Sequence, residues 1–337
     1  MRSPRSINSR KGGALLAVLW LSAALAAIAF SLATTVRGEI ERASTLGDGM
    51  RAHYLALGAI ERGLMWGRFG RGGAQAQPGP GAPAAVFSIQ TPLMVFPFPT
   101  GAAVVEVIPE TSKLDVNRAT PEQLFALLAA LGAHPAQALD IALAIVHWRS
   151  PGSGPLDNYY LAFGPSFRPR HASVQDVEEL AQVRGMTPEI YHGNYVRDAQ
   201  GRMVRLGAFK DCVSPWGSLN QFDVNTVEPA ILVAAGMDPM AAQRLVAYRS
   251  GQPVVGDAQM AEISMIAGPA AAKLRRGGGN SIYTLRATAR IRDAAGRLSD
   301  LRKTVAATVK FLPEGNKPPY HILRWDDTAV SEVSQWP

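Results

Sequence analysis

The sequence has a single cysteine, Cys212, among its 337 residues. One thiol excludes an internal disulfide bond, and it also excludes any metal site built from cysteine pairs. A lone cysteine is most often a small buried residue. We therefore expect Cys212 to lie in a hydrophobic core, and cysteine usage leaves the cellular compartment open.

Catalytic and metal-binding motifs are also missing from the sequence. No Gly-x-Ser-x-Gly elbow occurs, Cys212 has no neighbouring histidine, and no histidines have the spacing of a metal-binding motif. Distant side chains can converge when a chain folds, but nothing here assigns a catalytic or metal-ligating residue. We expect a protein that is not an enzyme. The six histidines are His53, His134, His147, His171, His192 and His321.

Acidic residues are absent before Glu39, so the N-terminus carries charge of one sign. Arg2, Arg5, Arg10 and Lys11 supply four positive charges ahead of an apolar run. The formal net charge is +7, and it falls to +3 without these four residues. The basic balance therefore reflects the N-terminus and is a weak argument for nucleic acid as a partner.

Residues 13–33 contain no charge. About twenty helical residues at 1.5 Å each span the roughly 30 Å hydrocarbon core of a bilayer. Because basic residues precede the run, the N-terminus should stay cytoplasmic and the bulk of the chain should cross the membrane. The rival is a cleaved secretory signal, with Ser31 and Ala33 forming a small-x-small site before Thr34. The length of the apolar run argues against such a signal, because the apolar region of a secretory signal usually has about 7–15 residues.

Helical periodicity continues beyond the apolar run. Apolar residues recur at steps of three and four through residues 34–66, which indicates an amphipathic half that follows the transmembrane half of one helix. This half needs a partner to cover its apolar stripe. The stripe consists of Val36, Ile40, Ala43, Leu46, Met50, Tyr54, Leu57, Ile60 and Leu64.

The N-terminus resembles that of type IV prepilin-like proteins, because a basic leader ends in Lys11-Gly12 before a long apolar helix. The resemblance implies that residues 1–12 are a leader and that prepilin peptidase cleaves between Gly12 and Gly13, with the next bond, Gly13–Ala14, as second choice. It also implies methylation of the new amino terminus. The core of the membrane helix would then begin with Ala14, Leu15, Leu16, Ala17, Val18 and Leu19.

Ala17 departs from the prepilin pattern, since most pilin-like subunits carry glutamate at this position of the mature chain. A carboxylate buried in lipid needs a partner, and in the family that partner is thought to be the amino terminus of the subunit above. A subunit without the acid cannot offer this contact. It is better suited to the top of a fibre than to the repeating body.

The rest of the chain divides by composition into a linker, two β regions and a helical region between them. Residues 67–85 are rich in Gly and Pro and predict a flexible linker. Residues 86–109 predict short strands, and residues 110–276 are mostly helical. Residues 277–312 alternate with period two and predict an antiparallel hairpin whose apolar face covers the helix stripe. The tail, residues 313–337, has no clear periodicity.

Two similar segments, LDVNRATPEQLFALLAALG and FDVNTVEPAILVAAGMDP, indicate an internal repeat in the helical region. In each, Asp-Val-Asn precedes a helix-opening proline, and the helix reaches a glycine stop before a second helix starts. The pattern predicts helical hairpins of the helix-hairpin-helix or SAM-like kind.

Such hairpins often bind DNA, so a membrane-anchored DNA receptor is the alternative function. DNA-binding hairpins usually place a second glycine in the turn, which lets backbone N–H groups approach a phosphate. Here that place is taken by His134, Thr187 and Asp238. No basic cluster flanks the turns, and we expect no nucleic acid partner.

Over nearly its whole length the chain resembles the protein K-type minor pseudopilins of the type II secretion system. The segment SVQDVEELAQVRGMTPEIYHGNYV, followed by the second Asp-Val-Asn segment, carries this resemblance. It implies an α+β fold, in which the long helix packs on a small antiparallel pilin-like sheet and a large helical domain is inserted into that body.

The resemblance implies a structural, non-catalytic role in protein secretion. Such a protein caps or initiates the tip of the pseudopilus with the I-type and J-type minor pseudopilins and contacts other pseudopilins. It would span the inner membrane of a Gram-negative bacterium once, with its body in the periplasm. Some relatives bind calcium, but neither Asp115 nor Asp223 begins a complete calcium loop. We expect these aspartates to cap turns, and calcium stays possible through scattered oxygens.

Overall fold

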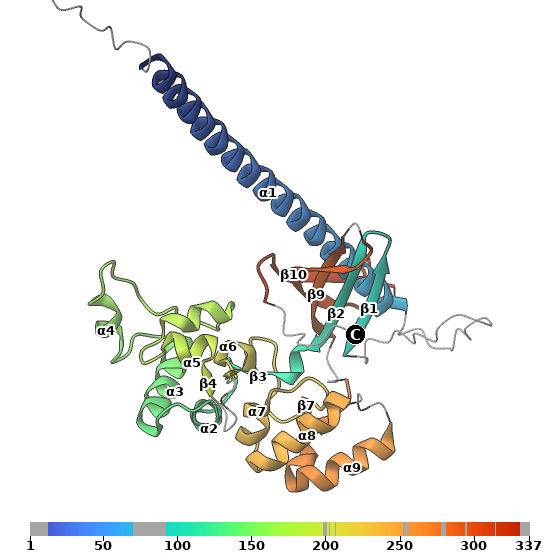
Figure 1. Ribbon diagram of the computed structural model, residues 1–337. Helices are drawn as coiled ribbons and strands as arrows, with labels where there is room; N and C mark the ends of the chain where they lie inside the picture. The colour runs from blue at the N-terminus through green and yellow to red at the C-terminus, as the bar shows by residue number, and fades with distance from the viewer. Residues whose placement is uncertain are drawn as a thin grey trace, which may run out of the picture.

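The computed structural model describes residues 13–69, 92–197, 201, 203–205, 207–251, 254, 256–277, 281–293, 295–313 and 315–330. The predicted leader, residues 70–85 of the predicted linker and the predicted strand at residues 86–90 lie outside the described residues. One helix, α1 (Gly13–Phe69), extends three residues past the predicted end at residue 66. Figure 1 shows α1 as a rod whose C-terminal part lies against a sheet and whose N-terminal part projects away from the rest of the molecule.

The sheet has five strands in the order β1-β2-β9-β10-β11, and all neighbours are antiparallel. Its strands are β1 (Leu93–Phe98), β2 (Gly101–Pro109), β9 (Ile282–Arg292), β10 (Leu298–Phe311) and β11 (Tyr320–Asp326). Because β2 pairs directly with β9, everything between Pro109 and Ile282 is an insertion between two neighbouring strands. This α+β arrangement, a long apolar helix on an antiparallel sheet, is the one expected from the sequence.

The tail contributes a strand that the sequence pattern does not reveal. β11 is an edge strand beside β10, and its residues are exposed or half-buried along its whole length. An edge strand of this kind has no face packed into the core, so it shows no alternation of apolar and polar residues.

Small residues form the face of α1 that packs on the sheet. Ala52, Ala56 and Ala59 are fully buried there, together with Ile60 and Leu64. A Cβ atom added at Gly63 would touch the side chains of Leu285 and Val105 at 3.5 and 3.7 Å. Small side chains let the sheet approach the helix closely, and β-strand residues such as Leu285, Ala287 and Val305 fill the space between them.

This packing corrects the prediction that the sheet covers the apolar stripe of residues 36–64. Only the C-terminal end of that stripe is covered, at Leu57, Ile60 and Leu64. With about 3.6 residues per turn, the buried small residues and the stripe from Val36 to Tyr54 lie on roughly opposite sides of α1. The prediction was based on the positions of large apolar side chains, whereas the contact between α1 and the sheet depends mainly on small ones.

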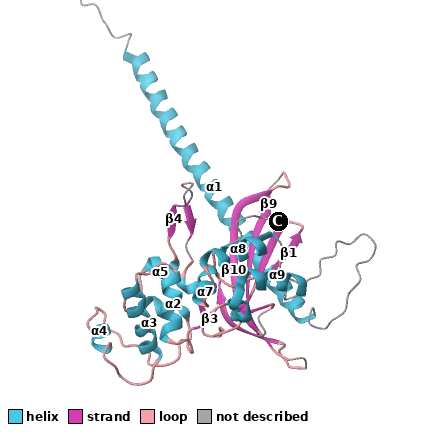
Figure 2. Ribbon diagram, turned by 90° about the horizontal axis from the view of Figure 1, so that it is seen from below, coloured by secondary structure: helices cyan, strands magenta, loops and turns pink. Residues whose placement is uncertain are grey.

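The inserted domain is mostly helical (Figures 1 and 2), and it consists of two units that begin alike, with a short strand followed by two helices. A short helix, η1 (Glu110–Ser112), leads into the first unit. That unit comprises β3 (Leu114–Asp115), α2 (Pro121–Ala130), α3 (Pro135–Arg149), α4 (Asp157–Leu161), η2 (Val177–Gln182), α5 (Pro188–His192), β4 (Tyr195–Arg197), β5 (Met203–Arg205), α6 (Phe209–Cys212) and β6 (Val213–Ser214). The second comprises β7 (Phe222–Asp223), α7 (Pro229–Ala234), α8 (Pro239–Gly251), α9 (Asp257–Ala267), η3 (Gly268–Lys273) and β8 (Leu274–Arg275). In both units the first and last strands form a two-residue parallel pair.

The same hydrogen bonds recur in the two units, and they explain the repeated Asp-Val-Asn segments. The Asn117 side chain donates to Val174 O at 2.9 Å and accepts from Val174 N at 2.7 Å. Asn225 makes the same pair of bonds with Val254, at 3.1 and 2.8 Å. Each asparagine thus holds a distant backbone segment beside the start of its unit.

The two aspartates of these segments accept hydrogen bonds from groups in their own turns, and Asp223 also accepts one from a distant backbone N–H. Asp115 Oδ1 accepts hydrogen bonds from the N–H groups of Asn117 and Arg118. Asp223 accepts from Gly277 N at 2.7 Å and from the hydroxyl of Thr226. Both aspartates therefore organise turns, as expected from the sequence.

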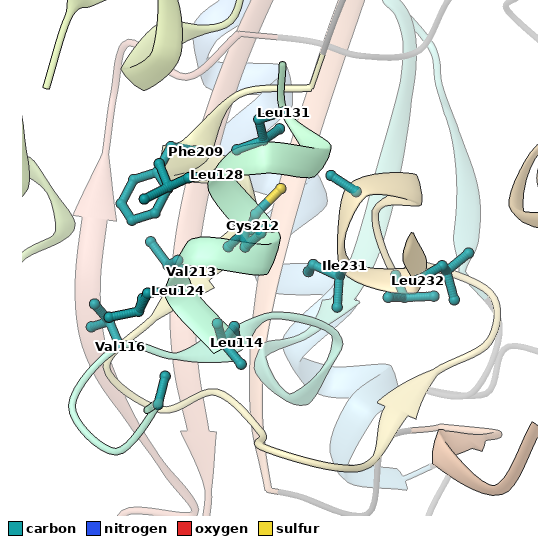
Figure 3. Packing of buried hydrophobic residues seen from close by; sticks show 14 of the residues in the cluster. Leu114, Val116, Leu124, Leu128, Leu131, Phe209, Cys212, Val213, Ile231 and Leu232 are labelled. Atoms are coloured by element: carbon teal, nitrogen blue, oxygen red, sulfur yellow. The ribbon is translucent and has the colours of Figure 1, made fainter. Parts of the chain in front are cut away.

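One hydrophobic core runs through both units of the inserted domain. Leu124 and Leu128 of α2 face Phe209 and the fully buried Cys212, and Ile231 of α7 lies beside them (Figure 3). Cys212 is therefore a small core residue, as predicted. A separate core lies between α1 and the sheet.

A buried carboxylate joins the inserted domain to the sheet. Glu110 is 2% exposed, and its side chain accepts hydrogen bonds from Ser214 of β6 and from Thr284 of β9, the latter at 2.6 Å. Lys113 Nζ lies 2.9 Å from the same carboxylate. Burial alone would raise the pKa of Glu110, but Lys113 and the hydroxyl donors outweigh it and hold the pKa below its ordinary value of 4.5.

Glu110→Ala should lower the free energy of unfolding by about 3 kcal/mol, because the change leaves a lysine and two hydroxyl groups without their buried partner. Since the folded-state pKa is lowered, the contribution of Glu110 should be complete above pH 4.5 and should decline as the pH falls below it. Urea unfolding of the full chain in detergent tests both points. Glu61→Ala, at an exposed position on α1, is the control, and equal midpoints for the two variants would contradict the assigned role.

A second test compares the two faces of α1. Ala56→Leu should lower the free energy of unfolding of the sheet domain by about 2 kcal/mol, since there is no room for the added atoms against the sheet. Ala43→Leu, on the exposed face, should change it by less than about 0.5 kcal/mol. The same unfolding measurement serves, and a larger loss for Ala43→Leu would show that the faces are assigned wrongly.

Candidate membrane anchor and assembly surface

The N-terminal half of α1 has the properties of a membrane span. Its mean hydropathy reaches 2.4, the apolar window is entirely unburied by the rest of the protein, and no other described helix is long and apolar enough to cross a bilayer. Leu15 and Leu19, within the predicted membrane core, are 75% and 62% exposed. This single apolar helix fits a membrane-anchored, single-pass protein.

The predicted processing site lies at the start of this helix. Gly13 is the first residue of α1, whereas Gly12 lies outside the described residues. Ala17 lies in the first turns of α1, and the helix has no acidic residue there. Cleavage between Gly12 and Gly13 stays a prediction.

An apolar stripe on the second half of α1 is left uncovered by the folded chain. We call this set the α1 stripe, and we limit it to large apolar side chains that are 48–71% exposed. Exposed apolar rows of this length mark contact surfaces. The α1 stripe consists of Val36, Ile40, Leu46, Met50 and Tyr54.

The helix N-termini that follow the glycine turns are occupied by the chain's own side chains. Asp238 Oδ1 accepts hydrogen bonds from Met240 N and Ala241 N, at 2.9 and 3.2 Å, where α8 begins. His134 accepts from Ala136 N before α3, and Thr187 accepts from Ile190 N before α5. These caps use the N–H groups that a DNA phosphate would need, which argues against the DNA-receptor alternative.

One cluster of chemically capable side chains was missed by the sequence reading. His147, Asp157 and His171 each offer a ligand atom, and these atoms lie within 4.8 Å of one another. They come from α3, α4 and the loop that precedes Val174, so no fixed spacing links them. The available signal was the presence of two histidines and one aspartate close together in the sequence, within residues 147–171.

Comparison with protein families gave one match that bears on the fold. Residues 105–193 match the family described as type II secretion system (T2SS), protein K. The matched residues contain most of β2 and the first unit of the inserted domain as far as α5. They also contain most of the segment on which the sequence resemblance was based.

Comparison with curated proteins gave no match. Among solved structures, the chain is similar to one in the crystal structure of the GspK-GspI-GspJ complex from the type 2 secretion system of enterotoxigenic Escherichia coli. The two are 17% identical, the TM-score is 0.45, and the similarity covers 88% of this chain and 99% of that chain.

The resemblance read from the sequence is thus confirmed by the family match: residues 105–193 of this chain match the type II secretion system protein K family.

Proposed function

We propose that this protein is a minor pseudopilin that initiates or caps the pseudopilus tip of a type II secretion system. One observation carries the proposal: α1 has a sheet-covered face and, on roughly the opposite side, the uncovered α1 stripe. The stripe continues directly from a segment of membrane-spanning length. A helix of this design can join a bundle of similar helices through the stripe while its own head stays attached to the other face.

The position at the tip follows from two features at opposite ends of the molecule. Ala17 removes the acidic contact that a subunit in the fibre body would offer to the amino terminus above it. The inserted domain, residues 110–276, adds a second globular mass beside the sheet (Figure 1). Neither feature suits a subunit that must repeat along a narrow fibre, and both are compatible with a terminal one.

The partners in this proposal are the I-type and J-type minor pseudopilins, with the other pseudopilins below them. Prepilin peptidase would process the chain at the inner membrane of a Gram-negative bacterium, and the sheet and inserted domain would lie in the periplasm. The role is mechanical and non-catalytic. Residues 105–193 support it through their family, and the α1 stripe provides the surface.

The first prediction concerns the amino terminus of the mature chain. Intact-mass spectrometry of protein purified from its native membrane should give a chain that starts at a methylated Gly13. A start at Thr34 would instead indicate a cleaved secretory signal, and a chain that retains Met1 would indicate no processing. Either result would contradict the fibre-tip assignment.

The second prediction concerns the α1 stripe. Met50→Asp should reduce secretion of the host's type II substrates at least tenfold, because it places an unpaired carboxylate where helices pack in the assembly. Stability should stay within about 0.5 kcal/mol of wild type, since Met50 is exposed in the isolated chain.

Secretion should be measured in a deletion strain complemented with each variant at equal protein level. Ser44→Asp, exposed on α1 but outside the α1 stripe, is the matched control and should restore secretion. Normal secretion in the uncomplemented deletion strain would remove the basis of the proposed function. Equal secretion by the Met50→Asp and Ser44→Asp strains would show that the α1 stripe has no part in the proposed function.

A further inference from the structure

Three side chains of the first unit converge on one point. His147 Nε2 lies 3.3 Å from Asp157 Oδ1, and His171 Nε2 lies 3.0 Å from the same oxygen. The two imidazole rings meet edge to face, with centroids 5.1 Å apart. All three side chains are mostly shielded from solvent, with exposed fractions of 12, 18 and 19% for His147, Asp157 and His171.

Neighbouring backbone groups orient two of these side chains. His171 Nδ1 lies 3.0 Å from Ser150 O. A carbonyl oxygen only accepts, so Nδ1 donates to it, and Nε2 is the ring nitrogen that faces Asp157 Oδ1, at a hydrogen-bond distance of 3.0 Å. With Nδ1 held as a donor, Nε2 is the nitrogen whose lone pair a metal ion would take. Asp157 Oδ2 accepts from Gly154 N at 3.1 Å, which leaves Oδ1 to face both rings. Metal-ligating histidines and carboxylates are held by outer hydrogen bonds of this kind.

His147 is the least satisfied of the three. Both of its ring nitrogens are buried, and neither has a partner of good hydrogen-bond geometry: Asp157 lies 3.3 Å away, and the backbone of Gly154 makes only a poorly aligned contact with the ring. Gly154 packs directly on the ring, where an added Cβ atom would lie 2.4 Å from Nε2. A buried polar group without a partner calls for a ligand.

The second unit of the inserted domain shows that the fold does not require this cluster. Its helix α8 ends in AQRLVAYR where α3 ends in ALAIVHWR, so Ala247 occupies the place of His147. In the second unit only residues 252 and 253 lie between the end of α8 and Val254, which makes the repeated contact with Asn225. In the first, residues 150–173 separate α3 from Val174, and they contribute Asp157 and His171. All three side chains are therefore additions to the repeated unit.

We propose that His147, Asp157 and His171 bind a divalent transition metal ion of the zinc class, with a fourth position left for water or a partner's side chain. Two imidazoles and one carboxylate are a donor set for zinc, whereas calcium prefers oxygen ligands alone. Zinc–ligand distances of about 2.0–2.2 Å place tetrahedral donor atoms roughly 3.3 Å apart, close to the two separations observed. Among the described residues, Arg184, which is paired with Asp140, also acts on His147 from outside the cluster.

The bound ion would fasten residues 150–173 to α3. This is a stabilising role in the inserted domain, independent of the assembly role of α1, so the two proposals can fail separately.

The test is metal binding by the full chain, purified in detergent without a histidine tag and stripped with chelator. Titration with Co²⁺ should give a visible ligand-field absorption with one ion per chain, and added Zn²⁺ should displace it. Zn²⁺ at about 100 times its dissociation constant should raise the unfolding midpoint measurably, whereas Ca²⁺ at the same concentration should leave it unchanged.

Asp157→Asn and His171→Gln keep the size of each side chain and should each weaken Zn²⁺ affinity at least tenfold. His321→Ala removes an exposed histidine outside the cluster and should bind Zn²⁺ as wild type does. Far-ultraviolet circular dichroism checks that the variants fold, and His147→Gln supplies a third variant if one of them does not. Wild-type affinity in the folded variants, no Co²⁺ absorption, or stabilisation by Ca²⁺ in place of Zn²⁺ would each overturn the proposal.

Discussion

The close contact between the sheet and the glycine and alanine face of α1 determines how the rest of the molecule can act. Because Ala52, Ala56 and Ala59 are buried against the strands, the rotation of the helix relative to the head is fixed. The large apolar side chains from Val36 to Tyr54 are consequently directed away from the head. An apolar row that is held in this orientation is available to other helices, and the head cannot fold back to cover it without giving up its own core.

The inserted domain is organised differently, because the same contacts recur in its two units. An asparagine holds a remote valine backbone in each unit, and an arginine at the end of the second helix donates to the valine carbonyl of the Asp-Val-Asn segment, Arg149 to Val116 and Arg249 to Val224. These paired contacts show what the repeated residues do: they close each unit on itself. Functional differences then arise where the units differ, and the longest difference contains Asp157 and His171.

Much of this architecture could be predicted from the sequence, and the failures have physical causes. The long apolar helix, the two similar units, the buried Cys212 and the final hairpin could be predicted because each depends on local periodicity or on fixed spacing. That the two units are of the helix-hairpin-helix or SAM-like kind stays a prediction. The covered face of α1 was predicted wrongly because alanine and glycine give little hydrophobic signal even when they are fully buried. β11 was not predicted because an exposed edge strand has no alternating pattern of apolar and polar residues. The convergence of His147 and His171 was not predicted because it depends on how residues 150–173 fold back on α3, and no local sequence pattern encodes that fold.

The pairing of β2 with β9 has a consequence for how such a molecule could diversify. Pro109 and Tyr283 are register partners, so the chain leaves the sheet and returns to it at adjacent positions, about 5 Å apart. Apart from the contact of Glu110 with Thr284, the sheet needs only that these two ends stay together, and it sets no length for the chain between them. An inserted domain of different size or content could therefore replace this one on the same sheet, while α1 and its packing against the sheet stay unaltered.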